Sequence, residues 1–409
     1  MPRRPALIRS ITVQMISYPH AAAVTPKTAD VVIIGAGVIG ASIAFHLTRR
    51  GIKPLVVEKN EPAAGSSGAC DGLVFLQSKK PGLHLELALE SRKRFDALMA
   101  ILGSGIEFKR TGGMCVIENE AELSAMRLSV DELRRSGLET ELIDGDEARR
   151  REPCLSEKVV AATFSALDSQ VNPYALTFAF LAAAKSAGAR ILTGEAVRAV
   201  EAISGKIRSV ITDNLKINSA VVVNAAGALA AEVGRLVGLE IPITPRRGQI
   251  LVTAAVPPLL RHCLISAQYV AAKFNPEIAA KGGMGFSLEQ ADSGNILIGS
   301  SREFVGFDRR TTFDGIRAIA GRIVPVVPAL RRVPVIRTFG GLRPYTPDGL
   351  PILGKVAGLD GFIMAAGHEG DGIALSAITG ELIADLIATG RTQFPLNHFR
   401  LERFRETAA

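Results

Sequence analysis

The sequence is poor in aromatic residues and in cysteine. Phe, Tyr and Trp together make up 5% of the 409 residues, and tryptophan is absent. The four cysteines, Cys70, Cys115, Cys154 and Cys263, lie far apart and form no CxxC pair. This spacing argues against a disulfide framework or a zinc site and is typical of a reducing compartment. We therefore expect a cytoplasmic protein without a bound metal, and peripheral association with the inner membrane is left open.

Long runs of like charge and long apolar runs are also missing. The net charge is +8, but the longest basic cluster is Arg149–Arg151, so no nucleic-acid partner is expected. The most apolar stretch, Val31–Leu47, contains three glycines and is shorter than the roughly 20 residues of a membrane span. Residues 1–28 are basic and contain no acidic residue. We expect a flexible extension there, and whether it is a targeting segment is left open.

The first organised segment predicts a nucleotide-binding unit. Asp30–Ile34 has the pattern of a buried parallel strand, a helix follows, and Pro54–Glu58 predicts the next strand. The turn before the helix has GxGxxG spacing, formed by Gly35, Gly37 and Gly40. These glycines allow a tight turn, close approach of the backbone to a pyrophosphate, and close packing of helix on strand. Because Glu58 ends the second strand, its carboxylate can accept hydrogen bonds from a ribose.

An isolated unit of this kind does not distinguish FAD from NAD, but two further segments favour FAD. Residues 65–72 are small and follow the second strand, where the chain can pass beneath a bulky ring. Residues 361–372 have the pattern of a strand, a glycine-rich turn and a helix start. The N–H groups and dipole of that helix would stabilise negative charge on a reduced flavin. An ordinary strand-to-helix turn is the alternative for this second segment.

Periodicity and capping residues predict the other elements. Asn172 and Pro173 open a helix that ends near Gly188. Further helices are predicted over residues 85–102, 122–136 and 372–388. Strands are predicted over residues 109–117, 196–203, 207–212 and 216–223, and residues 248–301 are predicted to be mainly strand, with a hairpin turn at 292–295. The Gly- and Pro-rich segment 339–354 is predicted to be a loop.

Six segments, taken in order, carry a resemblance to a known family. They are Val31–Glu58, Val197–Val200, Asn224–Gly227, Gly341–Pro344, Asp348–Pro351 and Gly367–Gly372. From Asp30 to the C-terminus, the chain resembles the D-amino acid oxidase-type (DAO) family of FAD-dependent oxidoreductases. This family includes glycine oxidase, sarcosine oxidase, and the opine oxidase and hydroxyproline dehydrogenase subunits. Residues 68–72 and 299–308 are most similar to the opine oxidase and hydroxyproline dehydrogenase branch.

The sequence departs from the family pattern in two places. Ala228 and Leu229 follow Asn-Ala-Ala-Gly, where the family usually has an aromatic residue. Cys263 is the only cysteine after residue 200, and it lies outside the context in which monomeric sarcosine oxidases attach the flavin. We therefore expect FAD to be bound non-covalently.

The resemblance implies an α/β fold class, with a Rossmann-like FAD-binding domain and a discontinuous α+β substrate domain on a mainly antiparallel sheet. The FAD-binding domain would comprise residues 29–84, 150–240 and 340–409. The substrate domain would comprise residues 85–149 and 241–339.

The residues expected to bind FAD fall into three groups along the chain. The first group surrounds the glycine-rich turn and the second strand: Gly35, Gly37, Val38, Ile39, Gly40, Glu58 and Lys59. The second group follows that strand: Ser66, Ser67, Gly68, Ala69 and Cys70. The third group comes from later motifs: Val197, Ala226, Gly227, Gly341, Arg343, Gly367, His368, Glu369, Gly370, Asp371, Gly372 and Ile373. For Cys70, small-residue packing is the main interpretation and a redox role the alternative.

Arg343 is the residue predicted to bind substrate, because the family's arginine in this Gly-Leu-Arg-Pro segment holds a carboxylate. A guanidinium can form two parallel hydrogen bonds to a carboxylate. An ion pair with a local acid such as Asp348 is the structural alternative. Tyr345 and Tyr269 are candidate further donors, the latter on the assumption that it lies in the substrate sheet, and burial in the core is the alternative for both. No residue is convincingly placed as a general base, and a proton-shuttling role for His368 is a minor alternative.

The resemblance implies FAD-dependent oxidation of a small amino acid or secondary amine. Candidates are a D-amino acid, glycine, sarcosine, D-proline, 4-hydroxy-D-proline or an opine. A hydride would leave the carbon beside nitrogen for flavin N5. Oxygen, a quinone or a partner subunit could accept the electrons, and a homo- or hetero-oligomer is compatible with the sequence. A tRNA-modifying FAD oxidoreductase, a non-catalytic flavoprotein subunit and an NAD-dependent dehydrogenase are the alternatives.

Overall fold

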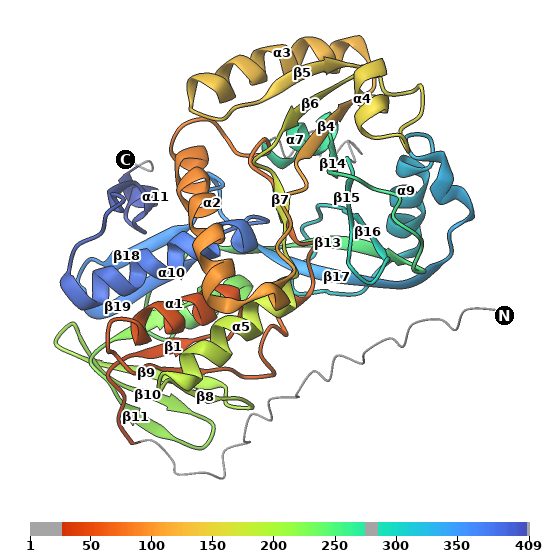
Figure 1. The fold of residues 1–409 in the computed structure, drawn as a ribbon. Helices are drawn as coiled ribbons and strands as arrows, with labels where there is room; N and C mark the ends of the chain where they lie inside the picture. Colours follow the sequence, from red (N-terminus) through yellow and green to blue (C-terminus); the bar gives the residue numbers. More distant parts are fainter. Residues whose placement is uncertain (1–26, 275–284, 407–409) are drawn as a thin grey trace.

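The computed structural model describes residues 27–274 and 285–406, so most of the expected basic extension lies outside the described residues. Within these ranges the chain forms two large sheets side by side, with helices packed on each (Figure 1). The first strand of the chain and the last strands lie together in one sheet, although more than 300 residues separate them. The fold class predicted from the sequence is confirmed.

The first sheet contains the predicted nucleotide-binding unit. In the described chain it has nine strands: β1 (Val32–Ile34), β2 (Leu55–Val57), β8 (Arg190–Leu192), β9 (Val197–Ile203), β10 (Lys206–Thr212), β11 (Lys216–Asn218), β12 (Val222–Asn224), β18 (Ile352–Val356) and β19 (Leu359–Ala366). Their order is β11-β10-β19-β12-β1-β2-β8, with β9 on β10 and β18 on β19. Strand β1 is parallel to both β2 and β12, as the β-branched run predicted.

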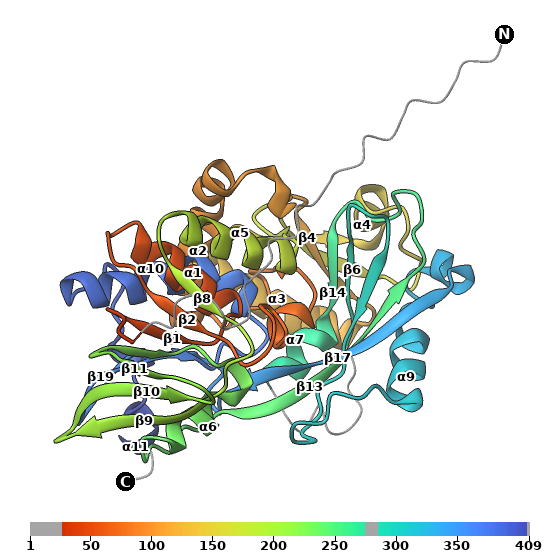
Figure 2. The same ribbon diagram turned by 90° about the horizontal axis from the view of Figure 1, so that it is seen from below.

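Successive residues of β1 face two different apolar cores. Val31 and Ile33 pack with the helices, whereas Val32 and Ile34 pack with residues of β10 and β12. Figure 2 shows α1 (Val38–Thr48), α5 (Pro173–Ser186) and α10 (Gly372–Thr389) on one side of β1 and β2, and β9–β11 toward the other side of these two strands. Burial on both faces explains why this strand has no polar residue after Asp30.

The helices over this sheet begin where the sequence indicates. The Asn172 side chain accepts a hydrogen bond from the Ala175 N–H at 3.1 Å, and Pro173 is the first residue of α5. Helix α10 packs against α1 and against α2 (Leu83–Leu102). Among the described residues, α10 is the one helix long and apolar enough to cross a membrane, and 61% of it is buried inside the protein. The short helices α6 (Ala230–Arg235) and α11 (Arg403–Glu406) complete this half.

The second sheet carries the other half of the molecule and is mainly antiparallel. In the described residues it has eight strands, in the order β17 (Val335–Tyr345), β13 (Thr244–Thr253), β16 (Ile296–Gly299), β15 (Ser287–Gln290), β14 (Cys263–Ser266), β4 (Gly113–Ile117), β6 (Ala161–Ser165) and β5 (Glu141–Asp144). Its helices are α3 (Glu120–Arg135), α4 (Gly145–Arg151), α7 (Ala267–Phe274) and α9 (Phe313–Ile323). Single-turn 3-10 helices lie at Ser66–Gly68, Ser104–Ile106, Gly227–Leu229, Pro328–Arg332 and Asn397–Phe399, and β3 (Leu73–Val74) pairs with β7 (Ser169–Gln170).

Three predictions of local structure were wrong. The segment 339–354, predicted as loop, contains the end of β17 and the start of β18. Its glycines are compatible with a strand because β17 pairs with β13 along most of its length. Residues distant in the sequence supply this pairing, so the local sequence pattern does not reveal it. Residues 267–274, predicted mainly as strand, form helix α7. The predicted strand 216–223 is interrupted between β11 and β12, which pair with different neighbours.

The hairpin predicted at 292–295 is confirmed, because β15 and β16 pair antiparallel on either side of it. Strand β6 lies in the second sheet, between β4 and β5. It falls within residues 150–240, which the sequence assigned to the other domain. A division of the chain by sheets therefore places residues 161–165 with the second sheet.

Candidate functional site

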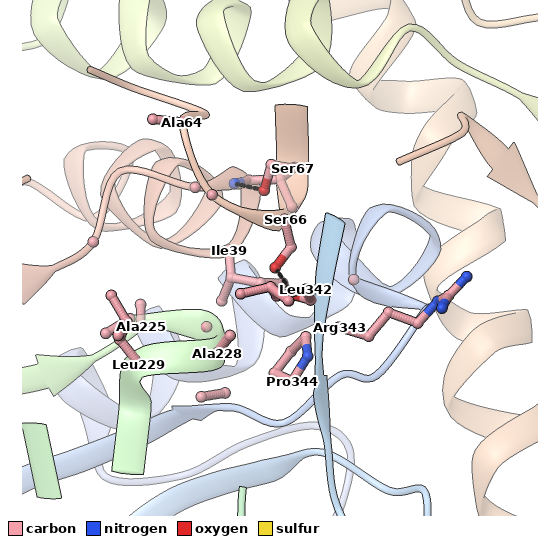
Figure 3. Close-up of a pocket in the computed structure, with 18 of the residues that line it drawn as sticks. Ile39, Ala64, Ser66, Ser67, Ala225, Ala228, Leu229, Leu342, Arg343 and Pro344 are labelled. Carbon is pink, nitrogen blue, oxygen red and sulfur yellow. Dashed lines mark hydrogen bonds between the residues drawn. The ribbon is translucent and has the colours of Figure 1, made fainter. Parts of the chain in front are cut away.

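A cavity of about 580 Å³ is lined by residues of both sheets. At one end lie β1, β2 and the start of α1, and at the other lie β13, β17 and α7. Figure 3 shows residues that follow β12, including Ala225 and Leu229, facing residues of β17 across this space. The cavity therefore joins the predicted nucleotide end to the predicted substrate end.

The start of α1 presents backbone rather than side chains to the cavity. Gly35 has φ +109°, and a Cβ there would lie 2.6 Å from the Ala225 carbonyl oxygen. Gly37 and Val38 line the cavity, and α1 has no side-chain cap hydrogen bond in the described chain. The Ser67 hydroxyl accepts a hydrogen bond from the Val38 N–H at 3.0 Å. The N–H groups of the first helical turn that remain unbonded can bind an anionic group such as a phosphate.

Glu58 is held at the carboxyl end of β2 by backbone donors. One carboxylate oxygen accepts from the Ala36 N–H and the other from the Asn60 N–H, each at 2.9 Å. These bonds tie the carboxylate to the glycine-rich turn and fix its direction. Since Glu58 also lines the cavity, its position agrees with the ribose-binding role predicted for it.

A second helix N-terminus faces the same cavity. Gly370, Gly372 and Ile373 at the start of α10 line it. Asp371 is turned away and binds Lys79 Nζ at 2.7 Å and His84 Nε2 at 3.0 Å. All three of these side chains are buried. Their pairing therefore offsets the free-energy cost of burying the Asp371 charge beneath the start of α10.

His368 lines the cavity but does not behave as a base. Its Nε2 lies 3.1 Å from the Thr379 hydroxyl, and burial lowers the pKa of the imidazole to about 3. The ring is therefore neutral at every pH at which the enzyme would work. This argues against the proton-shuttling alternative for His368.

The segment after β2 is fastened to β17. The Ser66 hydroxyl donates to the Leu342 carbonyl oxygen, as the dashed line in Figure 3 shows. Gly341 approaches Ala69 so closely that a Cβ at 341 would overlap the Ala69 carbonyl. Residues Ala69 to Asp71 are thereby brought from the first half of the molecule to the substrate end of the cavity.

Arg343 extends from β17 away from Ala225, Ala228 and Leu229 (Figure 3). Its guanidinium donates to the Ser301 carbonyl oxygen at 2.9 Å and to the Ser300 hydroxyl at 2.6 Å. On the neighbouring strand β13, two residues beyond the partner of Arg343, Gly248 leaves room for the guanidinium, because a Cβ there would lie 2.6 Å from Cζ of Arg343. Asp348 binds Arg403 at 2.7 Å and not Arg343, but a different acid, Glu369, forms an ion pair with Arg343.

A second arginine supports the first from the neighbouring strand. Arg246 pairs in register with Arg343, is 1% exposed, and forms an ion pair with Glu369. The same Glu369 oxygen lies 3.9 Å from Nε of Arg343. Glu369 has φ +51°, a left-handed conformation that costs about 1–2 kcal/mol for a residue other than glycine. These contacts hold one carboxylate between two arginines.

The two candidate tyrosines have different surroundings. Tyr269 lies on α7 rather than in the sheet, and it lines the cavity with the guanidinium of Arg302 4.1 Å above its ring. Tyr345 is not among the described residues that line the cavity. Its ring packs 4.6 Å from the Arg246 guanidinium and 5.1 Å from the Phe304 ring. Tyr345 therefore supports Arg246 and does not reach the cavity.

Sequence reasoning did not select Asp71 or Gly248, although both line the cavity. Asp71 lay within the small-residue segment 65–72, and only its charge distinguished it there. No local signal marks Gly248, because its importance depends on pairing with a strand about 90 residues later.

Most of the predicted site residues meet at this cavity. Those that line it are Gly35, Gly37, Val38, Ile39, Glu58, Lys59, Ser66, Ser67, Ala69, Cys70, Val197, Ala226, Gly227, Tyr269, Gly341, Arg343, His368, Glu369, Gly370, Gly372 and Ile373. Within the described chain, those that do not are Gly40, Gly68, Tyr345, Gly367 and Asp371. Gly40 packs instead against Gly35 and Ile33, which is the helix-to-strand contact expected of the third glycine.

Comparison with known proteins gives a consistent picture. Residues 30–386 match the family described as DAO, FAD dependent oxidoreductase. The chain is 32% identical to the hydrogen cyanide synthase subunit HcnC of Pseudomonas aeruginosa, over 94% of this chain and 98% of that protein. It is 30% identical to an opine oxidase subunit of Agrobacterium tumefaciens, over 93% and 99% respectively.

Solved structures show the same similarity. The L-proline dehydrogenase from P. horikoshii superposes with a TM-score of 0.85 at 27% identity, covering 93% of this chain and 99% of that one. The glycine oxidase from Geobacillus kaustophilus gives a TM-score of 0.84 at 30% identity, covering 92% and 99%. The resemblance inferred from the six sequence segments is confirmed.

Proposed function

The chain belongs to the DAO family of FAD-dependent oxidoreductases, and from this premise we propose that it dehydrogenates a small amino acid or secondary amine. The observation that carries the proposal is that Arg343 lines the same cavity as the first turns of α1 and α10, whose N-cap residues form no side-chain cap hydrogen bond. An anion-binding fork at one end and a nucleotide cradle at the other suit a carboxylate substrate beside a flavin.

The residues present fit FAD. Gly37, Val38 and Ile39 at the start of α1 would hold the pyrophosphate, and Glu58 the ribose. Gly370, Gly372 and Ile373 at the start of α10 would face the flavin, where the helix dipole favours negative charge. When bound, FAD supplies the hydride acceptor. Cys263 is buried among Thr111 and Gln170 and does not line the cavity, which supports non-covalent binding.

The protein's own residues would bind and orient the substrate. Arg343 uses two N–H groups on Ser300 and Ser301, and its remaining N–H groups can bind a carboxylate in fixed orientation. The ion pair of Glu369 with Arg246 would keep Glu369 from competing fully for Arg343. Leu229, Val233 and Leu236 add apolar surface to the lining of the cavity, which would limit the water in it.

The proposal also covers the partner, the domain division and the location of the protein. HcnC and the opine oxidase relative are both named as subunits, so we propose that this chain also works with a partner subunit, which would accept electrons if oxygen or a quinone does not. The two-domain division stays as expected from the sequence, except that we assign 161–165 to the substrate domain. A cytoplasmic location is part of the same proposal.

Anaerobic mixing of the FAD-loaded protein with candidate amines tests the function. Glycine, sarcosine, D-proline, 4-hydroxy-D-proline, D-alanine and an opine should be compared by bleaching of the flavin absorbance. We expect at least one of them to bleach it without nicotinamide, which would exclude both an NAD-dependent dehydrogenase and a non-catalytic subunit. If none does while FAD is retained, the proposed function is wrong.

A further inference from the structure

Asp71 is an acidic residue at the substrate end of the cavity. It lines the cavity together with Tyr269 and Arg343 and is half-buried. One of its carboxylate oxygens accepts a hydrogen bond from the Ser287 hydroxyl at 2.9 Å. Gly299, on the strand beside Ser287, leaves space for this contact, because a Cβ there would overlap the Ser287 hydroxyl. The carboxylate is thus held in place and still reaches the cavity.

A second carboxyl group lies beneath Asp71 and does not reach the cavity. Glu289, two residues after Ser287 on the same face of β15, is 6% exposed. Both of its oxygens accept from the Gly72 N–H at 2.9 Å. Burial and the charge of Asp71 raise the pKa of Glu289 to about 8. Each carboxyl of this pair is therefore easier to protonate than one in water, and Glu289 is the member shielded from solvent.

Several neighbouring groups change the pKa of the Asp71 carboxyl. Burial raises the pKa of Asp71, and this is opposed by the Ser287 hydrogen bond and by the charges of Arg343 and Arg302. The charge of Lys109 likewise lowers the pKa of Glu289. The result is a carboxylate beside a cationic fork that is easier to protonate than one in water.

We propose that Asp71 accepts the proton that the substrate's ammonium group must lose before oxidation. In this step an N–H bond of the ammonium breaks, its electron pair stays on nitrogen, and an O–H bond forms on the Asp71 carboxylate. The nitrogen lone pair is then available to assist loss of hydride from the neighbouring carbon. The inference rests on the proposed function and assigns Asp71 as a catalytic residue of that reaction.

The arrangement favours Asp71 over the other ionisable groups at the cavity. Arg343 is the group for the carboxylate of an amino acid, and Asp71 stands close enough for their charges to interact. His368 is neutral and hydrogen-bonded to Thr379. Glu369 is engaged by Arg246.

The test is the pH profile of flavin bleaching at saturating substrate in the wild type and in Asp71→Asn. With Asp71 as acceptor, the apparent pKa of the wild-type profile belongs to the protein and stays fixed for amines of different basicity. At pH 7, Asp71→Asn should bleach about a hundredfold more slowly or worse. Its rate should rise as the free amine becomes available, with a profile that moves with the substrate. An unchanged profile in Asp71→Asn would overturn the inference.

Ser287→Ala is the second variant, and it leaves the carboxylate in place. Because the Ser287 hydrogen bond lowers the pKa of Asp71, its loss should shift the profile to higher pH. A profile that does not move would count against Asp71 even if Asp71→Asn lost FAD. Asp146→Asn is the matched control, since that side chain is 87% exposed on α4.

Ligand binding provides a readout that does not depend on turnover. 2-Aminoisobutyrate and 2-hydroxyisobutyrate have no hydrogen on the reacting carbon, so their binding to the oxidised holoenzyme can be followed by flavin absorbance. Asp71→Asn should weaken binding of the amine ligand about tenfold and leave binding of the hydroxy acid unchanged. An equal change in both affinities would make Asp71 structural.

The bleaching experiments distinguish failure of this inference from failure of the proposed function. If no amine bleaches the wild type, the proposed function fails. If bleaching occurs with the same pH profile in wild type and Asp71→Asn, only this inference fails.

Discussion

The two ends of the cavity recognise their ligands by different means. The end formed by α1 and β2 presents backbone N–H groups and glycines, and backbone donors there hold both oxygens of the Glu58 carboxylate. The other end presents side chains, namely Arg343, Tyr269 and Asp71. Backbone recognition suits a cofactor that does not change, whereas side chains can be exchanged to suit a different substrate.

The largest effect should come from filling the backbone end. Gly37→Val should abolish retention of FAD, because its side chain would stand in the cavity near Ser67, where a Cβ already lies 3.1 Å from the hydroxyl oxygen. The ratio of flavin to protein absorbance after purification measures this. Gly321→Val is the control, because nothing lies within 4 Å of its Cβ position on α9. A fully yellow Gly37→Val protein would show that the glycine is structural only.

Acid release should also show that the cofactor is not attached. Heat or acid should move the yellow colour into the supernatant as FAD. Colour remaining with the precipitate would mean covalent attachment, contrary to the position of Cys263.

At the side-chain end, Arg343→Lys should separate affinity from cofactor binding. Lysine keeps the charge and loses the fork, so apparent substrate affinity should fall about tenfold or more, because hydrogen bonds to charged groups contribute about 1.5–3 kcal/mol. FAD content should not change. Arg337→Lys, on the exposed part of the same strand, is the matched control. Normal affinity in Arg343→Lys would place the anion site elsewhere.

A smaller effect is expected from Gly248→Ala. The added methyl group would occupy the place of the Arg343 guanidinium, which is the end of a flexible side chain and can move without unfolding the strand. Apparent affinity should fall severalfold, about 1 kcal/mol, with thermal stability nearly unchanged. Titration of the substrate and a melting curve distinguish this outcome from general destabilisation. A variant that melts early without a change in affinity would contradict the role given to this glycine.

The smallest effects concern the dependence of stability on pH, where His368 and Glu289 should act in opposite directions. His368 has a folded-state pKa of about 3 against 6.5, so the unfolded state binds more protons between these values, and stability is lost as the pH falls through that window. Glu289 has a folded-state pKa of about 8 against 4.5, so the folded state binds more protons, and stability is lost as the pH rises from 4.5 to 8.

Melting temperatures measured from pH 5 to pH 8 test this difference. His368→Asn should flatten the acid side and Glu289→Gln the alkaline side, each by a few degrees, since one pKa unit corresponds to at most about 1.4 kcal/mol. Parallel curves for all three proteins would mean that neither residue titrates as its burial indicates.

The same difference explains what the sequence could predict. The Gly35–Gly40 turn, Glu58 and the start of α10 are local patterns, because a few consecutive residues create the geometry. The substrate end depends on register between β13 and β17, whose facing residues Gly248 and Gly341 are 93 positions apart. A local reading of residues 339–354 found glycines and predicted a loop. Helix α7 was not predicted because its apolar residues also fit a strand. The surroundings of Tyr269, which lies on this helix, were therefore not predicted either.

The pairing of β13 with β17 limits how this protein can diverge. Arg246 faces Arg343 and Gly248 faces Gly341, and side chains of a strand alternate between its faces. One inserted or deleted residue within either strand would turn the arginine fork to the opposite face and bring different side chains over Ala69. Point substitutions leave that alternation intact. We therefore expect related proteins with new substrate preferences to differ here by exchanged residues, and to vary in length only beyond the ends of the two strands.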